Sequence, residues 1–171
     1  MNKDNNEIMA LINAFRMDGL GNDFVIIDRR KNSIDLAKEK IIELGSRSNI
    51  GFDQIIFIEK EKENFFPITI FNSDGGEISA CGNGSRCVAY LLGKNLNTKE
   101  IKLKTNNRMI NAKIIGNLQV ELEMGKPLFS FKDIPLSKTI NPADITLEIN
   151  NKTFAGGFCV NVGNPHIIFF C

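Results

Sequence analysis

The stretch Cys81-Gly82-Asn83-Gly84-Ser85-Arg86-Cys87 leads directly into the apolar run Val88-Ala89-Tyr90-Leu91-Leu92. Because the run is apolar almost all round, it predicts a buried helix that starts near Ser85 and ends between Gly93 and Asn95. Cys81 is then at the N-terminus of this helix. The free N–H groups and the dipole of a helix N-terminus stabilise negative charge, so Cys81 is expected to tend towards the thiolate and to act as a base or nucleophile.

A free cysteine is more often a small buried apolar residue than a reactive group. For Cys81 that interpretation is weakened by Gly82 and Gly84, which cost helix stability but allow an anionic ligand to approach the backbone. Cys87 lies about two turns further along the same helix, among apolar residues. Core packing is the better assignment for Cys87.

Short strands are predicted on both sides of this helix. Before it we expect a polar lead-in, a glycine loop over 18–23 and a buried strand over 24–28. An amphipathic helix over 34–44, capped by Ser33, and an antiparallel pair of strands over 54–59 and 67–71 follow. After it we expect strands over 102–104, 109–115 and 118–124, with Gly116-Asn117 as a hairpin turn, and a second β region that begins near Thr153. The fold class is therefore α/β, of the α+β type.

The segment from Gly125 to Pro142 holds three of the five prolines and breaks the strand pattern. We therefore expect a polar N-terminal extension over residues 1–14, a domain over 15–125 that carries Cys81, and a linker with part of a second domain over 126–171. The chain closes on an apolar strand, Ile167 to Phe170, before Cys171. Because an unprotected apolar strand is an aggregation hazard, further residues are expected to follow.

Composition favours a small-molecule partner. Twenty-one basic and twenty acidic residues give no electrostatic signature for nucleic acid or for a membrane surface. The polar start of the chain resembles no signal peptide, and no apolar run is long enough to span a bilayer, so a cytoplasmic protein is expected. The cysteines are too few and too scattered for a disulfide framework, and their spacing does not suggest a zinc site; they are Cys81, Cys87, Cys159 and Cys171.

Several side-chain amides lie beside glycines and turns. An amide donates and accepts at once, so a group of them can hold both the ammonium and the carboxylate of a zwitterion; the amides are Asn22, Gln54, Asn72, Asn83 and Asn164. His166 is the only imidazole, and Pro165 restricts the backbone before it, so His166 is either a positioned general base or a satisfied loop histidine. The chain has no Gly-x-Ser-x-Gly elbow, Walker sequence or complete dinucleotide fingerprint.

Five motifs together resemble, in order and spacing, the diaminopimelate epimerases: Met17 to Phe24, Gly51 to Gln54, Phe71 to Glu77, Cys81 to Cys87, and Gly163 to His166. The resemblance runs from about Phe15 onward. It implies inversion at the α-carbon of a diaminopimelate stereocentre, from the LL to the meso form, for the synthesis of lysine and peptidoglycan precursors. It also implies a two-thiol proton transfer with no cofactor and no metal.

The resemblance assigns roles residue by residue. Cys81 matches one of the two catalytic cysteines, and His166 is expected behind a catalytic thiol, where it helps to set its protonation. The residues expected to contact the substrate are Asn22, Gln54, Asn72, Gly82, Asn83 and Asn164.

The implied fold is a twisted or barrel-like β-sheet around a central helix, followed by a second copy that is incomplete in this chain. The family's second cysteine follows the equivalent of His166, and neither Cys159 nor Cys171 matches it. An inactive or weakly active truncation is therefore expected. The alternative is a non-catalytic half-domain that binds amino acids or a partner protein. A homodimer in which two copies face one another and each supplies Cys81 is a further arrangement that the sequence leaves open.

Overall fold

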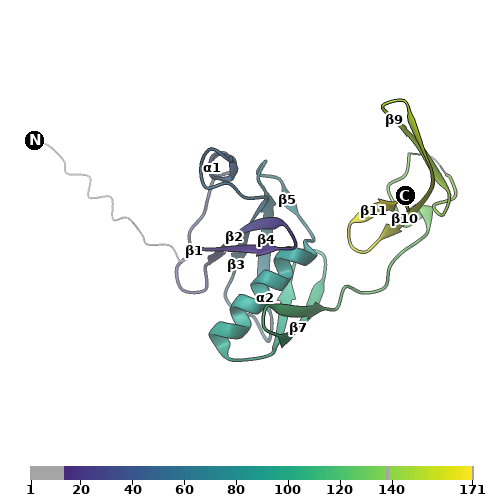
Figure 1. The fold of residues 1–171 in the computed structure, drawn as a ribbon. Helices are drawn as coiled ribbons and strands as arrows, with labels where there is room; N and C mark the ends of the chain where they lie inside the picture. Colours follow the sequence, from purple (N-terminus) through teal and green to yellow (C-terminus); the bar gives the residue numbers. More distant parts are fainter. Residues whose placement is uncertain (1–13, 138, 171) are drawn as a thin grey trace, which may run out of the picture. The chain divides into compact units, whose positions relative to one another are not determined.

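A computed structural model describes residues 14–137 and 139–170 of the chain, which divides into two compact units, one up to Leu122 and one from Glu123 (Figure 1). The predicted boundary lies after residue 125. Residues 1–13 of the expected N-terminal extension, and Cys171, lie outside the described residues.

The first unit is a sheet with the strand order β1-β2-β3-β4-β6-β7-β8, and β5 pairs with β4. Helix α1 follows β2 and helix α2 follows β5. The strands are β1 (Ala14–Gly19), β2 (Asn22–Asp28), β3 (Gln54–Ile58), β4 (Phe66–Asn72), β5 (Glu77–Ile78), β6 (Glu100–Lys104), β7 (Met109–Gly116) and β8 (Gln119–Leu122); the helices are α1 (Lys38–Gly45) and α2 (Gly82–Leu96).

Helix α2 is the centre of this unit. It contacts β1 and β2 as well as β7 and β8, which are the two ends of the strand order, so the sheet curls around it (Figure 1). Val88, Ala89 and Leu92 are fully buried against the sheet. The predicted barrel-like sheet around a central helix, and the buried helix that begins at the thiol, are confirmed.

The central strands are apolar on both faces. Phe24 and Ile26 pack in the cluster beneath α2, whereas their neighbours Val25 and Ile27 pack in a second cluster with Ile41 of α1. A strand that is buried on both faces gives a continuous apolar run, which is the pattern from which these strands were predicted.

The second unit contains a sheet with the order β11-β10-β9 and a short 3-10 helix, η1. Its elements are η1 (Phe131–Asp133), β9 (Ile145–Ile149), β10 (Lys152–Asn161) and β11 (Pro165–Ile168). Its buried cluster is small and consists of Ile134, Ile145 and Cys159.

Two predictions in the N-terminal third are wrong. The expected glycine loop over 18–23 is a hairpin, in which Leu20 and Gly21 form the turn at φ values of 56° and 86° and the flanking residues pair as β1 and β2. The first helix begins at Lys38 with Ala37 at its N-cap, not at Ile34 after Ser33. The Arg29 side chain donates to the Ile34 carbonyl at 2.6 Å and to Asp35, and this contact holds the segment before the helix in a non-helical form.

The second β region also starts earlier than expected. Strand β9 precedes Thr153 and pairs with β10 through a turn in which Asn150 and Asn151 have φ values of 52° and 60°. Asparagine tolerates this left-handed conformation, so the Asn-Asn pair was the signal for the hairpin. The predicted hairpin after β7 is present, but the turn falls on Asn117 and Leu118, one residue later.

The stability of the first unit is expected to depend on Leu92. Leu92→Ala should lower the free energy of unfolding by about 2–5 kcal/mol, because it leaves a cavity beneath α2. Urea denaturation followed by circular dichroism measures the change. Leu96→Ala is the matched control on the same helix: Leu96 is 46% exposed, and this variant should lose less than about 1 kcal/mol. Equal losses in the two variants would contradict the packing described above.

Candidate active site

One edge of the sheet brings three of the predicted amides together. Strand β2 runs parallel to β3, and β3 runs antiparallel to β4, with Gln54 opposite Asn72. The first residues of β2 and β3 and the last residue of β4 therefore lie at the same edge. These residues are Asn22, Gln54 and Asn72, and all three are partly buried.

Cys81 lies at the N-cap of α2 with extended backbone dihedrals, and its sulfur accepts the Gly84 N–H at 3.3 Å. The Cys81 S–H donates to Gln54 Oε1 at 3.2 Å, and Gln54 Nε2 donates to Asn72 Oδ1 at 3.2 Å. The thiol is thus joined to the amides at the sheet edge.

Gly84 allows this arrangement. A Cβ atom at this position would lie 2.6 Å from Ile56 Cδ1 and 3.2 Å from Cys81 Sγ. The first turn of α2 therefore packs directly on β3, and the sulfur fits between them.

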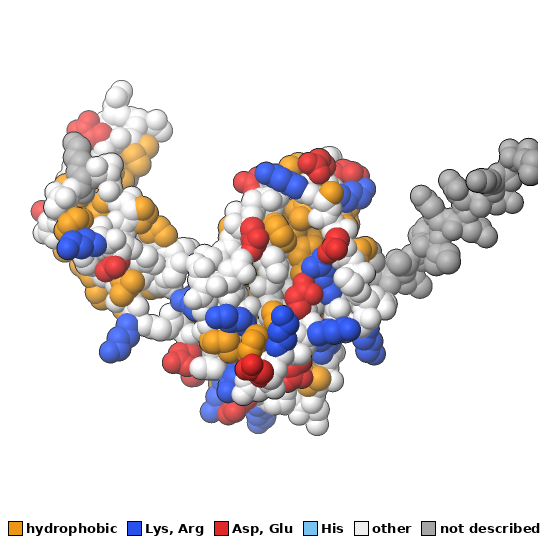
Figure 2. All heavy atoms as spheres, turned by 180° about the vertical axis from the view of Figure 1, so that it is seen from behind, with side chains coloured by type: hydrophobic (Ala, Val, Ile, Leu, Met, Phe, Trp, Pro, Cys, Tyr) orange, Lys and Arg blue, Asp and Glu red, His pale blue; other side chains and the backbone are white. Residues whose placement is uncertain are grey.

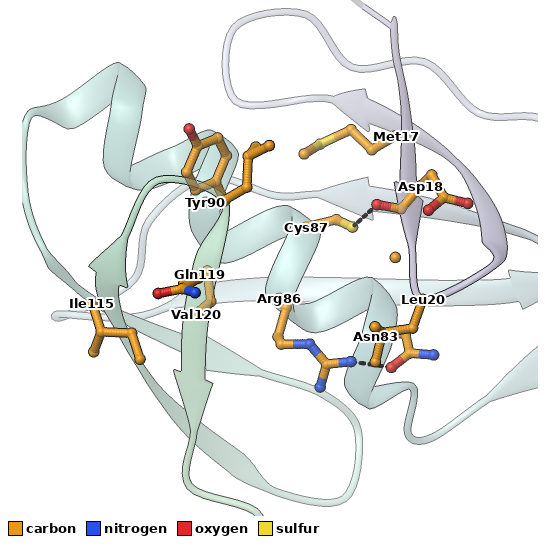
Figure 3. Close-up of a pocket in the computed structure, with 12 residues that line it drawn as sticks. Met17, Asp18, Leu20, Asn83, Arg86, Cys87, Tyr90, Ile115, Gln119 and Val120 are labelled. Atoms are coloured by element: carbon orange, nitrogen blue, oxygen red, sulfur yellow. Dashed lines mark hydrogen bonds between the residues drawn. The ribbon is translucent and has the colours of Figure 1, made fainter.

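A second set of hydrogen bonds starts from Asn83 in the first turn of α2. Asn83 Nδ2 donates to Asn22 Oδ1 at 2.8 Å, and Asn22 Nδ2 donates to Asp53 Oδ2 at 3.1 Å. Arg86 donates to Asn83 Oδ1, and in Figure 3 its guanidinium reaches back along the helix to this amide. Arg47 donates to Asp53 Oδ1 at 2.5 Å.

The pKa of the Cys81 thiol is raised, because burial disfavours the thiolate. The backbone N–H groups of Gly84 and Asn83 and the charge of Arg86 lower it, and the charge of Asp53 raises it further. The helix N-terminus therefore acts in the predicted direction but is outweighed by burial. The expectation that Cys81 tends towards the thiolate is wrong for the ligand-free site.

Cys87 is buried in the core, as predicted, and its S–H donates to the Asp18 carbonyl at 3.6 Å (Figure 3). Burial raises its pKa to about 11. A cavity of about 470 Å³ lies beside this part of α2, lined mainly by the two hairpins β1–β2 and β7–β8. It adjoins the amides at Asn83 but is not lined by Cys81.

Asn164 and His166 belong to the second unit. His166 Nε2 and Asn164 Oδ1 are 3.1 Å apart, and both side chains are exposed. The structure therefore joins these two predicted residues to each other. Gly82 is the first residue of α2 and lies with the residues around Cys81.

Three charged residues were missed by the sequence analysis as parts of this site: Arg47, Asp53 and Arg86. Asp53 and Arg86 fall inside motifs that were recognised, Gly51 to Gln54 and Cys81 to Cys87, so the position of each motif was a signal. Their partners are not local in every case, because Asp53 and Asn22 are 31 residues apart.

On the face drawn in Figure 2, Lys and Arg side chains are interspersed with Asp and Glu side chains. Among residues 14–137 and 139–170, no group of three or more His, Cys, Asp or Glu residues is arranged to hold a metal ion. None of the described helices is long and apolar enough to cross a bilayer.

The family model for diaminopimelate epimerase matches residues 14–130. Among curated relatives, the diaminopimelate epimerase of Pelagibacter ubique (strain HTCC1062) is 52% identical over 162 residues, which are 93% of this chain and 59% of that protein. The diaminopimelate epimerase of Acidiphilium cryptum (strain JF-5) is 38% identical over 165 residues, which are 95% of this chain and 58% of that protein. The chain thus spans somewhat more than half the length of these relatives.

Solved structures agree on the fold. A Bacillus anthracis phenazine biosynthesis protein of the PhzF family superposes with a TM-score of 0.57 at 20% identity. The match covers 92% of this chain and 53% of the Bacillus anthracis chain. A predicted epimerase from Pseudomonas aeruginosa gives a TM-score of 0.53 at 17% identity, over 85% of this chain and 52% of its own. With the family model matching most of its residues, this chain belongs to the diaminopimelate epimerase family.

Proposed function

We propose that this chain takes part in the inversion of LL-diaminopimelate to meso-diaminopimelate, with Cys81 as one of two groups that transfer the α-proton. The observation that carries the proposal is the position of the thiol: at the N-cap of α2, bonded to the Gly84 N–H and to Gln54. A proton-transfer group has to be held within hydrogen-bonding reach of its target, and these contacts hold the sulfur in place.

The surroundings of Cys81 suit the α-carbon of an amino acid. The first-turn N–H groups of α2 favour the substrate carboxylate, which gains negative charge as the α-proton leaves. The amides of Asn22, Gln54, Asn72 and Asn83 offer carbonyl oxygens to the ammonium group as well as N–H donors to the carboxylate. Asn164 and His166 are proposed as further contributors from the second unit.

Inversion needs a second proton-transfer group on the opposite face of the α-carbon. Cys87 does not suit this role, because its thiol is buried and donates to the Asp18 carbonyl. Cys159 is 2% exposed within the core of the second unit. Cys171 lies outside the described residues and does not match the family's second cysteine, so for the 171-residue polypeptide assayed by itself we expect little inversion.

The function is tested by incubating the chain with LL-diaminopimelate in deuterium oxide. Cys81→Ser should lower the rate of α-deuteration by at least about 100-fold, because a serine hydroxyl is a far weaker acid than a thiol at this position. Mass spectrometry measures deuterium incorporation, and chiral chromatography separates the LL and meso isomers. A single thiol on one face returns deuterium with retention, whereas two groups on opposite faces give inversion.

Cys87→Ser is the matched control, since it removes the other thiol of the same helix. It should keep most of the deuteration rate of the parent chain. Equal rates in Cys81→Ser and the parent chain would contradict the role of Cys81. Binding of diaminopimelate in calorimetry without any deuteration would favour the amino-acid-binding alternative instead.

Alkylation should show that the thiol is protonated in the free site. A group whose pKa is raised keeps its proton to higher pH, so the iodoacetamide reaction of Cys81 should reach half its maximal rate at a higher pH than that of an exposed thiol. Cys87, with a pKa of about 11, should react at still higher pH. Peptide mass spectrometry resolves the two sites. A midpoint for Cys81 near neutral pH would contradict the dominance of burial.

A further inference from the structure

A row of hydrogen bonds at the sheet edge begins and ends on charged side chains. Arg86 donates to Asn83 Oδ1, Asn83 Nδ2 donates to Asn22 Oδ1, and Asn22 Nδ2 donates to Asp53 Oδ2. Every bond in the row points the same way, from the guanidinium to the carboxylate.

The two ends differ from the two middle members in their chemistry. A guanidinium can only donate and an ionised carboxylate can only accept, whereas an amide does both and can be turned to exchange its oxygen and nitrogen. If Asn83 were turned, its NH₂ group would face the donor of Arg86. If Asn22 were turned, its oxygen would face the carboxylate of Asp53.

Asp53 is held as an acceptor from several sides. Its Oδ2 also accepts the Asp23 N–H at 3.0 Å, and its Oδ1 accepts from Arg47 at 2.5 Å. The hydrogen bond from Asn22, the Asp23 N–H and Arg47 lower the pKa of this carboxyl against the effect of burial. The acceptor end of the row is therefore a carboxylate at neutral pH.

The backbone of residue 53 is paired separately. Its N–H donates to the Asp23 carbonyl at 2.9 Å, and its carbonyl accepts the Ser73 N–H at 3.0 Å. The sheet edge is therefore closed by the main chain, and the Asp53 side chain is left to contact the amides and Arg47.

We propose that Asp53 and Arg86 are positioning residues that together fix which way the Asn22 and Asn83 amides face, and so determine where the site offers N–H donors and where it offers carbonyl oxygens. Each amide keeps one N–H and one carbonyl lone pair beyond the row. The remaining N–H groups would bind the carboxylate of an amino acid and the remaining carbonyl oxygens its ammonium group, so their positions set the orientation of the ligand. The last step rests on the proposed function, whereas the orientation of the amides does not.

The two ends act on the same row without touching each other, which makes the proposal testable by a double-mutant cycle. Asp53→Asn replaces an end that can only accept, and Arg86→Gln replaces an end that can only donate. Each puts in its place an amide that can both donate and accept. Either single variant leaves one charged end, which still orients the row. The double variant leaves four amides in a row that can point in either direction.

We expect the double variant to lose more diaminopimelate affinity than the product of the two single losses, by a further factor of about fivefold or more. Calorimetry with the 171-residue chain measures the affinity, and KM is measured where turnover is observed. Arg86→Lys should keep most of the affinity in either background, because an ammonium also donates only. Asp35→Asn, at an exposed carboxylate that pairs with Arg29, is the control for removing a surface charge and should have no effect.

A second readout does not depend on the ligand. In ¹⁵N–¹H spectra of the ligand-free chain, the NH₂ signals of Asn22 and Asn83 should keep a hydrogen-bonded proton in both single variants and in Arg86→Lys. In the double variant each amide should sample both orientations, so both NH₂ signals should shift to averaged positions or broaden. Spectra of Asn22→Ala and Asn83→Ala assign the signals.

Two results would overturn the proposal: multiplicative losses of affinity in the double variant, or NH₂ signals that respond to each single variant as strongly as to the double. A parent chain that neither binds nor converts diaminopimelate would refute the proposed function instead. The NH₂ signals would then still decide whether Asp53 and Arg86 orient the amides.

Discussion

The rest of the first unit depends on how closely α2 approaches β3, and residue 84 sets that distance. With glycine there, the helix lies against Ile56 without an intervening side chain, and the sulfur of Cys81 fits beside the first turn. The same approach buries Val88 and Leu92 further along the helix. Core packing and the position of the thiol are therefore consequences of one contact. A change that lifts the helix from the sheet would alter both.

Two opposing effects act on the thiol, and their balance decides its state. Backbone N–H groups and Arg86 favour the thiolate, while burial and the charge of Asp53 favour the protonated form. Burial is the larger effect in the ligand-free site. Such a balance would serve the proposed proton transfer, because a base that is buried and poorly solvated becomes stronger when a bound substrate supplies the missing stabilisation.

Much of the fold was predictable because local patterns carry it. The all-round apolar run marked α2, and the residues before it placed the thiol at its start. The start of α1 was not predictable, because the contacts of Arg29 with Ile34 and Asp35 override a helical pattern. Among the site residues, the amides were found by type, but the hydrogen bond between Asp53 and Asn22 depends on strand register and joins residues 31 positions apart. Composition and spacing do not contain that information.

The hydrogen bond from Cys81 to Gln54 links protonation to geometry. When the thiol gives up its proton, the sulfur and Gln54 Oε1, which are 3.2 Å apart, become two acceptors facing each other. The amide of Gln54 has to rotate to offer its N–H to the sulfur, which turns its oxygen towards Asn72. In the structure the oxygen of Asn72 accepts from Gln54, so the Asn72 amide has to rotate as well and present its NH₂ group. The two hydrogen bonds thus couple the protonation state of Cys81 to the orientation of both amides.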